Sequence, residues 1–274
     1  MKTTAGVLGG SFVYSCTFDE SFAYDKFVPE SVLAYQITGQ TRIYHQRGDL
    51  VLQEGQLLLA RGNQFAKSIK VPPEGKEYRC VLVLLTRDRL RNFALANKIA
   101  CPGRFQGKRN IILEPDALLL GYFNSLLPYL ERWKTVNKRM TTMKVNEAIE
   151  LLLHLHPELT SFLFDFSDPH KGNLEEFMLK NFSYNAPIKY FAKLSGRSLT
   201  GFKRDFAATF KTSPAAWLKA KRLSEAYRLI TEKNQKPQNI YLDLGFENLS
   251  HFYTAFKQQY GHTPAQIRLQ SPQN

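Results

Sequence analysis

A cluster of cationic and small polar side chains between residues 197 and 204 could bind duplex DNA. Opposite the apolar stripe of a predicted helix lie Thr200, Gly201, Lys203 and Arg204, and Arg197 and Ser198 stand at the N-terminus of that helix. An arginine can donate two hydrogen bonds to the O6 and N7 atoms of guanine, and a cation placed off the groove floor binds phosphate instead. We expect Arg204 to contact a base and Lys203 to contact a base or a phosphate. The alternative is an ordinary solvated helix face.

A second cluster, 50 residues further along, offers weaker donors and acceptors. It consists of Asn248, Ser250, His251, Tyr253, Thr254 and Lys257 and contains no arginine. Serine, threonine and asparagine can read base edges, but each contributes less than a bidentate arginine. Lys257, one helical turn further along, is expected to contact a phosphate. We therefore expect the second cluster to discriminate between DNA sequences less sharply than the first.

Both clusters belong to a unit that occurs twice. Phe202 and Phe252 are 50 positions apart, and Phe206 and Phe256 repeat this spacing. The turn glycines that precede the clusters are 49 positions apart, so the second copy carries one extra residue in its turn. A repeat with a fixed period indicates one small structural unit used twice.

The apolar spacing predicts that each unit is a pair of short helices. Residues 188–194 carry apolar side chains on one helical face, and Gly196 follows, where a left-handed turn is least costly. Ser198 is a suitable N-cap for a second helix. The apolar face of that helix consists of Leu199, Phe202, Phe206 and Phe210. Helix, glycine turn and helix at this length form the helix-turn-helix pattern, whose second helix enters the DNA major groove.

A longer helix expected over residues 214–231 joins the two units. Its inward side carries Trp217, Leu218, Leu223, Ala226, Leu229 and Ile230. Its other sides carry Lys219, Lys221, Arg222 and Arg228. A stiff linker of this kind fixes the separation of the two reading helices, so that both can enter successive major-groove segments on one face of the duplex.

Two segments carry a family resemblance. Residues 244–264, with the sequence LGFENLSHFYTAFKQQYGHTP, resemble the signature of the AraC/XylS family of bacterial transcription regulators. Residues 217–226 resemble the linker helix of that family, and the resemblance covers about the last 100 residues closely. One departure is Tyr241, which stands where the family usually has a small residue. We therefore expect the second helix pair to pack differently from the first.

The resemblance implies a regulator, an activator by preference, that binds promoter DNA and commonly contacts RNA polymerase. It also implies that the N-terminal half is a cupin-like barrel that senses a small-molecule effector or a regulatory protein, and that the chain forms a homodimer. Two alternatives stay open: a cupin-type metal enzyme and a nonspecific architectural DNA-binding protein.

The N-terminal half changes to short apolar strands separated by turn residues. Strands are expected at 32–38, 41–45, 50–53, 56–60, 65–71 and 78–85, and the first two read as a hairpin. This spacing predicts a small barrel or jelly roll. Helices expected at 116–133 and 142–156 form a pair that either caps the open end of the barrel or, as the resemblance implies, meets a second copy.

The predicted fold is therefore a two-domain α+β architecture. Residues 1–166 form the cupin-like β-barrel with its helical pair, which senses or dimerises. Residues 167–173 form a linker, and residues 174–274 form the all-α double helix-turn-helix domain.

The sequence offers little material for catalysis. His45 is the only histidine in residues 32–85, whereas a divalent metal site requires three or four ligands. His154 and His156 are two residues apart at a helix end and do not share a face. We expect no enzyme activity, no metal and no cofactor.

Charge and composition favour a polyanionic partner in a reducing compartment. The net charge is +13, and residues 173–274 hold 15 Lys and Arg against 7 Asp and Glu. The three cysteines are odd in number and irregularly spaced, which fits the cytosol better than a disulfide scaffold. No apolar run approaches the roughly 20 residues that span a bilayer, so we expect a cytoplasmic protein without a membrane partner.

Overall fold

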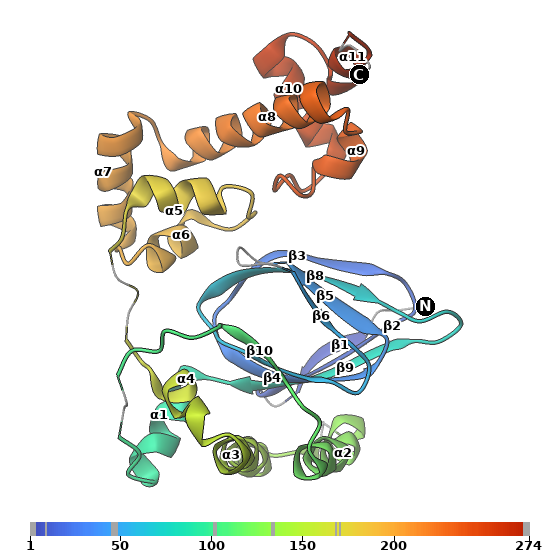
Figure 1. Cartoon of the computed structure of the whole chain (residues 1–274), viewed down its shortest axis with the longest axis vertical. Helices are drawn as coiled ribbons and strands as arrows, with labels where there is room; N and C mark the ends of the chain where they lie inside the picture. Colours follow the sequence, from blue (N-terminus) through green and yellow to red (C-terminus); the bar gives the residue numbers. More distant parts are fainter. Residues whose placement is uncertain are drawn as a thin grey trace. The chain divides into compact units, whose positions relative to one another are not determined.

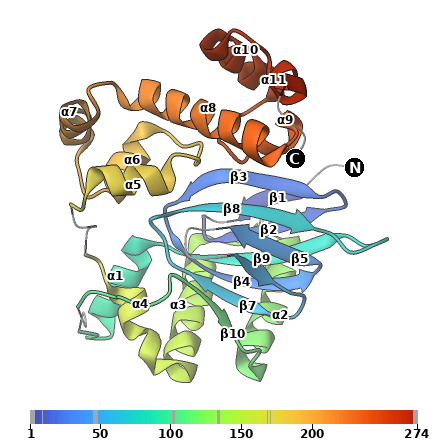
Figure 2. The ribbon, with the colours of Figure 1, turned by 45° about the horizontal axis from the view of Figure 1, so that its top comes forward.

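The computed structural model describes residues 4–8, 10–44, 49–100, 103–132, 135–167, 169 and 171–270. The chain forms two compact units, whose elements are labelled in Figures 1 and 2. The first unit comprises residues 1–23 and 28–167, and the second comprises residues 24–27 and 168–274.

The first unit contains two β-sheets. The larger sheet has the strand order β1 (Thr4–Leu8), β2 (Phe12–Thr17), β9 (Tyr78–Leu85), β4 (Ser31–Thr38), β7 (Leu57–Ala60) and β10 (Asn110–Leu113). The smaller sheet has the order β3 (Ser21–Val28), β8 (Gln64–Val71), β5 (Gln40–Tyr44) and β6 (Leu50–Leu52). Each strand pair with a described register is antiparallel.

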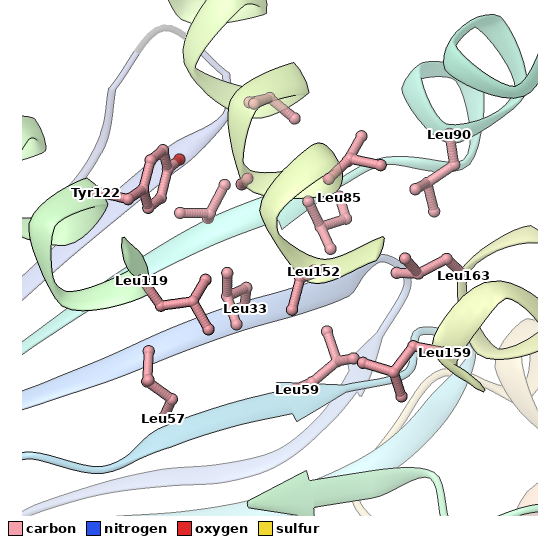
Figure 3. Close-up of a cluster of buried hydrophobic side chains, with 14 of the residues drawn as sticks. Leu33, Leu57, Leu59, Leu85, Leu90, Leu119, Tyr122, Leu152, Leu159 and Leu163 are labelled. Atoms are coloured by element: carbon pink, nitrogen blue, oxygen red, sulfur yellow. The ribbon is translucent and has the colours of Figure 1, made fainter. Parts of the chain in front are cut away.

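Helices cover the larger sheet on the face that lies away from the smaller sheet (Figures 1 and 2). These helical elements are α1 (Arg87–Ala96), α2 (Ala117–Glu131), α3 (Lys138–Leu155), a 3₁₀ turn (Pro157–Leu159) and α4 (Thr160–Phe164). Figure 3 shows leucines of β4 and β7 facing leucines of α2 and α3 in one apolar cluster. The unit therefore has three layers, namely helices, larger sheet and smaller sheet.

The central strands of the larger sheet are covered on both faces, which explains the apolar runs at residues 32–35, 57–60 and 80–85. In β4, Leu33 packs against the helices, whereas Val32 and Ala34 pack between the sheets. In β7, Leu59 packs against the helices and Leu58 packs between the sheets. Successive side chains of a strand point to opposite faces, so a strand covered on both sides favours apolar residues at successive positions. Gln36 of β4 is an exception, and its buried amide bonds to Thr38, Arg79 and Thr41.

Several expectations for this half need correction. The two sheets do not close into a barrel, because the strands of one sheet pair with each other and not with those of the other. The expected hairpin over residues 32–45 is wrong: β4 pairs with β7 and β9, and β5 pairs with β6 and β8. The chain instead crosses between the sheets at Gly39, whose φ is +81°. Helices α2 and α3 cover a sheet face and not the open end of a barrel.

Sequence reasoning also missed some elements of the first unit. Strands β1, β2, β3 and β10 and helix α4 were not expected. In β2 the burial alternates incompletely, with Phe12 and Ser15 buried and two partly exposed residues between them, so no clear period marks the strand.

The second unit is all-helical among its described residues from 171 onward. Its helices are α5 (Leu174–Asn181), α6 (Ile188–Leu194), α7 (Leu199–Phe210), α8 (Pro214–Lys233), α9 (Pro237–Ile240), α10 (Leu249–Tyr260) and α11 (Pro264–Gln270). Across the described part of the chain, no helix combines the length and apolarity needed to cross a bilayer.

Candidate nucleic-acid interface

Helix α7 buries one face and exposes the other. Ser198 caps the helix by accepting a hydrogen bond from the N–H of Gly201 at 3.1 Å. Phe202 and Phe206 are fully buried. The opposite face leaves Ser198, Thr200, Lys203 and Arg204 exposed and Gly201 partly exposed. The structure therefore brings five of the six expected side chains of the first cluster onto one accessible surface.

Arg197, the sixth member of that cluster, lies differently. Its side chain is only 7% exposed, and its guanidinium donates to the carbonyls of Ser195 and Gly172 and to the carboxylate of Asp205. Arg197 therefore holds the turn that precedes α7. Its acceptors are mostly main-chain atoms, which its sequence position does not reveal.

Leu199 corrects the expected apolar face of α7. It was expected to point inward with Phe202 and Phe206, but it is 42% exposed. As the first residue of the helix it lies beyond the edge of the buried cluster, so helical spacing alone misplaces it.

Helix α10 repeats this design. Asn248 caps it by accepting a hydrogen bond from the N–H of His251 at 2.8 Å, and Phe252 and Phe256 are fully buried. The exposed residues are Asn248, Ser250, His251, Thr254 and Lys257. Tyr253 is partly exposed and packs edge-on against Phe252, with ring centroids 6.0 Å apart.

Helix α8 separates the two recognition helices. It has 20 residues and is therefore about 30 Å long, close to the roughly 34 Å of one DNA turn. Helices α7 and α10 lie at opposite ends of α8 (Figures 1 and 2). Trp217 packs against Phe210 of α7 at 4.8 Å between ring centroids, and Tyr227 packs against Tyr260 of α10 at 4.9 Å. Matching aromatic contacts thus attach each recognition helix to the spacer.

Arg222 connects the middle of α8 to both halves of this unit. Its guanidinium donates to the carbonyls of Phe182 and Tyr184, each at 2.8 Å, and to the carbonyl of Gly245 at 3.1 Å. Gly245 has a φ of +81°, and a Cβ there would lie 2.5 Å from the Ser183 carbonyl oxygen and 3.0 Å from Cζ of Arg222. This approach of main chain to main chain requires glycine. The sequence placed Arg222 only on an outer side of the linker helix.

The two helix-turn-helix units differ in their first helices. Helix α6 has seven residues and is followed by a turn at Gly196, whereas α9 has four residues and leads into a longer turn. Ala192 is fully buried, while Tyr241, in the corresponding place, is partly exposed. The larger side chain accompanies the shorter helix in the second unit.

Side chains suited to metal binding do not converge in the described part of the chain. No three His, Cys, Asp or Glu residues there could hold a metal ion together. His154 is exposed, and His156 lies 3.3 Å from Glu158. His45 lies outside the described residues.

Comparison with known proteins gives a family match for each of the two units. A family described as a helix-turn-helix domain matches residues 191–270, and one described as the ExsA N-terminal regulatory domain matches residues 31–162. The HTH-type transcriptional regulator ExsA of Pseudomonas aeruginosa is 25% identical over 95% of this chain and 94% of its own length. The thermoregulatory protein LcrF of Yersinia pestis is 30% identical over 47% of this chain and 49% of its own. A crystal structure of ToxT from Vibrio cholerae covers 96% of this chain and 98% of its own, at 13% identity and a TM-score of 0.42.

Two helix-turn-helix units on one spacer helix, preceded by a β-rich regulatory domain, define a DNA-binding transcription regulator of two domains. The chain belongs to the AraC/XylS family of transcription regulators. The resemblance recognised in residues 217–226 and 244–264 is thereby confirmed.

Replacing Gly245 by alanine should destabilise the second unit more than replacing Gly261. Both glycines have positive φ, +81° and +75°, so each change carries a backbone penalty of about 1–2 kcal/mol. Only at Gly245 does the added methyl also meet main-chain atoms, since nothing lies within 4 Å of the corresponding position at Gly261. Urea unfolding followed by Trp217 fluorescence, with Trp133 replaced by phenylalanine, measures the difference. Equal losses would contradict the close approach.

The Asp205 carboxyl should titrate well below its ordinary range. Hydrogen bonds from Lys171 at 2.8 Å and Arg197 at 3.2 Å lower the pKa of Asp205 to about 2. Since the folded-state pKa lies below the unfolded one, the ion pairs stabilise the fold above pH ~4, and this stabilisation is lost as the pH falls toward 2. In an NMR titration, Lys171→Met should raise the midpoint of Asp205, whereas Lys203→Met, which removes a neighbouring charge, should change it much less. An unshifted midpoint in Lys171→Met would refute the role of Lys171.

Proposed function

We propose that the second unit binds promoter DNA by inserting α7 and α10 into successive major-groove segments on one face of the duplex. The observation that carries the proposal is the location of two capped recognition helices at opposite ends of the 20-residue helix α8. The proposed contact residues are Ser198, Thr200, Gly201, Lys203 and Arg204 in the first reader, and Asn248, Ser250, His251, Tyr253, Thr254 and Lys257 in the second. Arg197 supports the first reader by holding its turn.

The two recognition helices, α7 and α10, are proposed to differ in how strongly they discriminate between DNA sequences. Arg204 is 79% exposed and has the fork geometry that grips guanine, while α10 exposes small polar groups, His251 and Lys257. The first half-site is then read mainly through hydrogen bonds to base edges. The second contributes more through phosphate contacts and shape.

The first unit is proposed to receive the controlling signal, from a small-molecule effector or a regulatory protein. ExsA, which matches over 94% of its length, is named a transcriptional regulator, and VirF of Yersinia enterocolitica, which matches over about half of its length, is named a transcriptional activator. The chain would accordingly activate transcription by engaging RNA polymerase at the promoter, in the bacterial cytoplasm and without catalysis of its own.

A homodimer is proposed to form through α2 and α3, which expose apolar side chains. Leu118 of α2 is 51% exposed and Met143 of α3 is 65% exposed. Changing both to glutamate should shift the protein toward monomer in sedimentation equilibrium at micromolar concentration, because charges would be buried in the contact. Leu95→Glu, on an exposed apolar residue of α1, is the matched control. A wild-type chain that sediments only as monomer would rule the dimer out.

Replacing Arg204 by alanine should weaken binding to a cognate duplex by about 1–3 kcal/mol, since a bidentate base contact is lost. Fluorescence anisotropy with cognate and random duplexes at fixed salt measures this effect. Arg42→Ala, which removes an equal charge from an exposed site on β5, controls for net charge and should leave affinity nearly unchanged. An equal loss on both duplexes would instead assign Arg204 to phosphate.

A further inference from the structure

Arg222 reaches carbonyls on either side of the spacer helix. Two acceptors, Phe182 and Tyr184, follow α5, whose last residue is Asn181. The third, Gly245, precedes the N-cap of α10 by three residues. Helix α5 packs against α7, so one guanidinium contacts the supports of both recognition helices.

The chemistry of these contacts makes them directional. The last carbonyls of a helix lack intrahelical partners, and a cation near a helix C-terminus is favourable. A guanidinium is planar and rigid, so donating from Nε, Nη1 and Nη2 at once fixes the three carbonyls relative to one plane. The aromatic contacts at the ends of α8 are different in kind, since ring contacts tolerate small rotations and shifts.

A second observation shows how closely this arrangement is fitted. Gly245 lies so near the Ser183 carbonyl that a Cβ could not be added without movement. The turn before α10 and the turn after α5 therefore meet beside the guanidinium, with no side chain of residue 245 between them. A change in the angle between the two halves would have to break this contact.

We infer that Arg222 sets the spacing and angle between α7 and α10, and so determines which separation of two DNA half-sites the chain accepts. This inference rests on the proposed two-helix binding mode. Arg222 is a positioning residue, because its guanidinium is engaged by the protein main chain.

The test measures selectivity for half-site spacing. A duplex is selected from a random-sequence library with the wild-type chain, and versions are made with one and two base pairs inserted between the half-sites. Each inserted base pair turns one half-site by ~35° and moves it by ~3.4 Å relative to the other. Wild-type affinity should fall by about tenfold or more for the longer insertion, as for a lost base contact.

Arg222→Lys keeps the charge but lacks the fork, and Arg222→Met lacks both. In each variant the ratio of affinities for the original and lengthened duplexes should fall toward one. Lys233→Met removes a charge from an exposed site in the last turn of the same helix and should keep the wild-type ratio even if overall affinity drops. Circular dichroism measures whether each variant is folded.

The outcomes separate the inference from the function on which it rests. A wild-type chain without spacing preference would overturn the two-helix binding mode, and the inference with it. A folded Arg222→Lys chain that keeps the wild-type ratio would overturn the inference alone. An unfolded Arg222→Lys chain would also overturn it, because Arg222 would then be required for folding and not for spacing.

Discussion

Burial of the apolar face of α8 is the interaction on which the DNA-binding unit depends. Leu223, Ala226 and Ile230 join Phe252 and Phe256 of α10 in one cluster, while Trp217 packs against the aromatic rings of α7. A helix of 20 residues has little stability alone in water, and packing along its length supplies most of it. Packing along α8 therefore holds α7 and α10 at opposite ends of the spacer helix, and the Arg222 contacts are proposed to fix the spacing and angle between them.

The first unit obeys a different constraint. Its larger sheet has helices on one face and the smaller sheet on the other, so the central strands have no solvated side. Strands held in this way resist a change of register. A shift of one residue would move the side chains that pack against the helices to the face of the smaller sheet, and the reverse. Such a layer would be a rigid base for the signal-receiving surface proposed for this unit.

The sequence predicts the parts of this fold that follow a period and misses those that depend on distant contacts. The strands from residue 32 to 85 are visible as short apolar segments between turn residues, and the phenylalanines of α7 and α10 are visible because their burial repeats at helical spacing. The expected hairpin failed because the path from β4 to β5 depends on how two sheets share a core. Likewise, Arg197 and Arg222 look like exposed cations from their spacing, yet both bind main-chain carbonyls from other segments. Residue types cannot reveal acceptors that every residue possesses.

Three acceptors of Arg222 are peptide oxygens, and this has a consequence for how such a protein can diverge. Substitutions at Phe182 or Tyr184 leave those oxygens in place, so the hydrogen bonds from Arg222 do not depend on which side chains stand at these positions. The residues on the outward faces of α7 and α10 accept none of these three hydrogen bonds. Substitutions on the outward faces of α7 and α10 can therefore change the preferred DNA sequence while the proposed spacing between the two helices is kept. The two properties depend on different atoms.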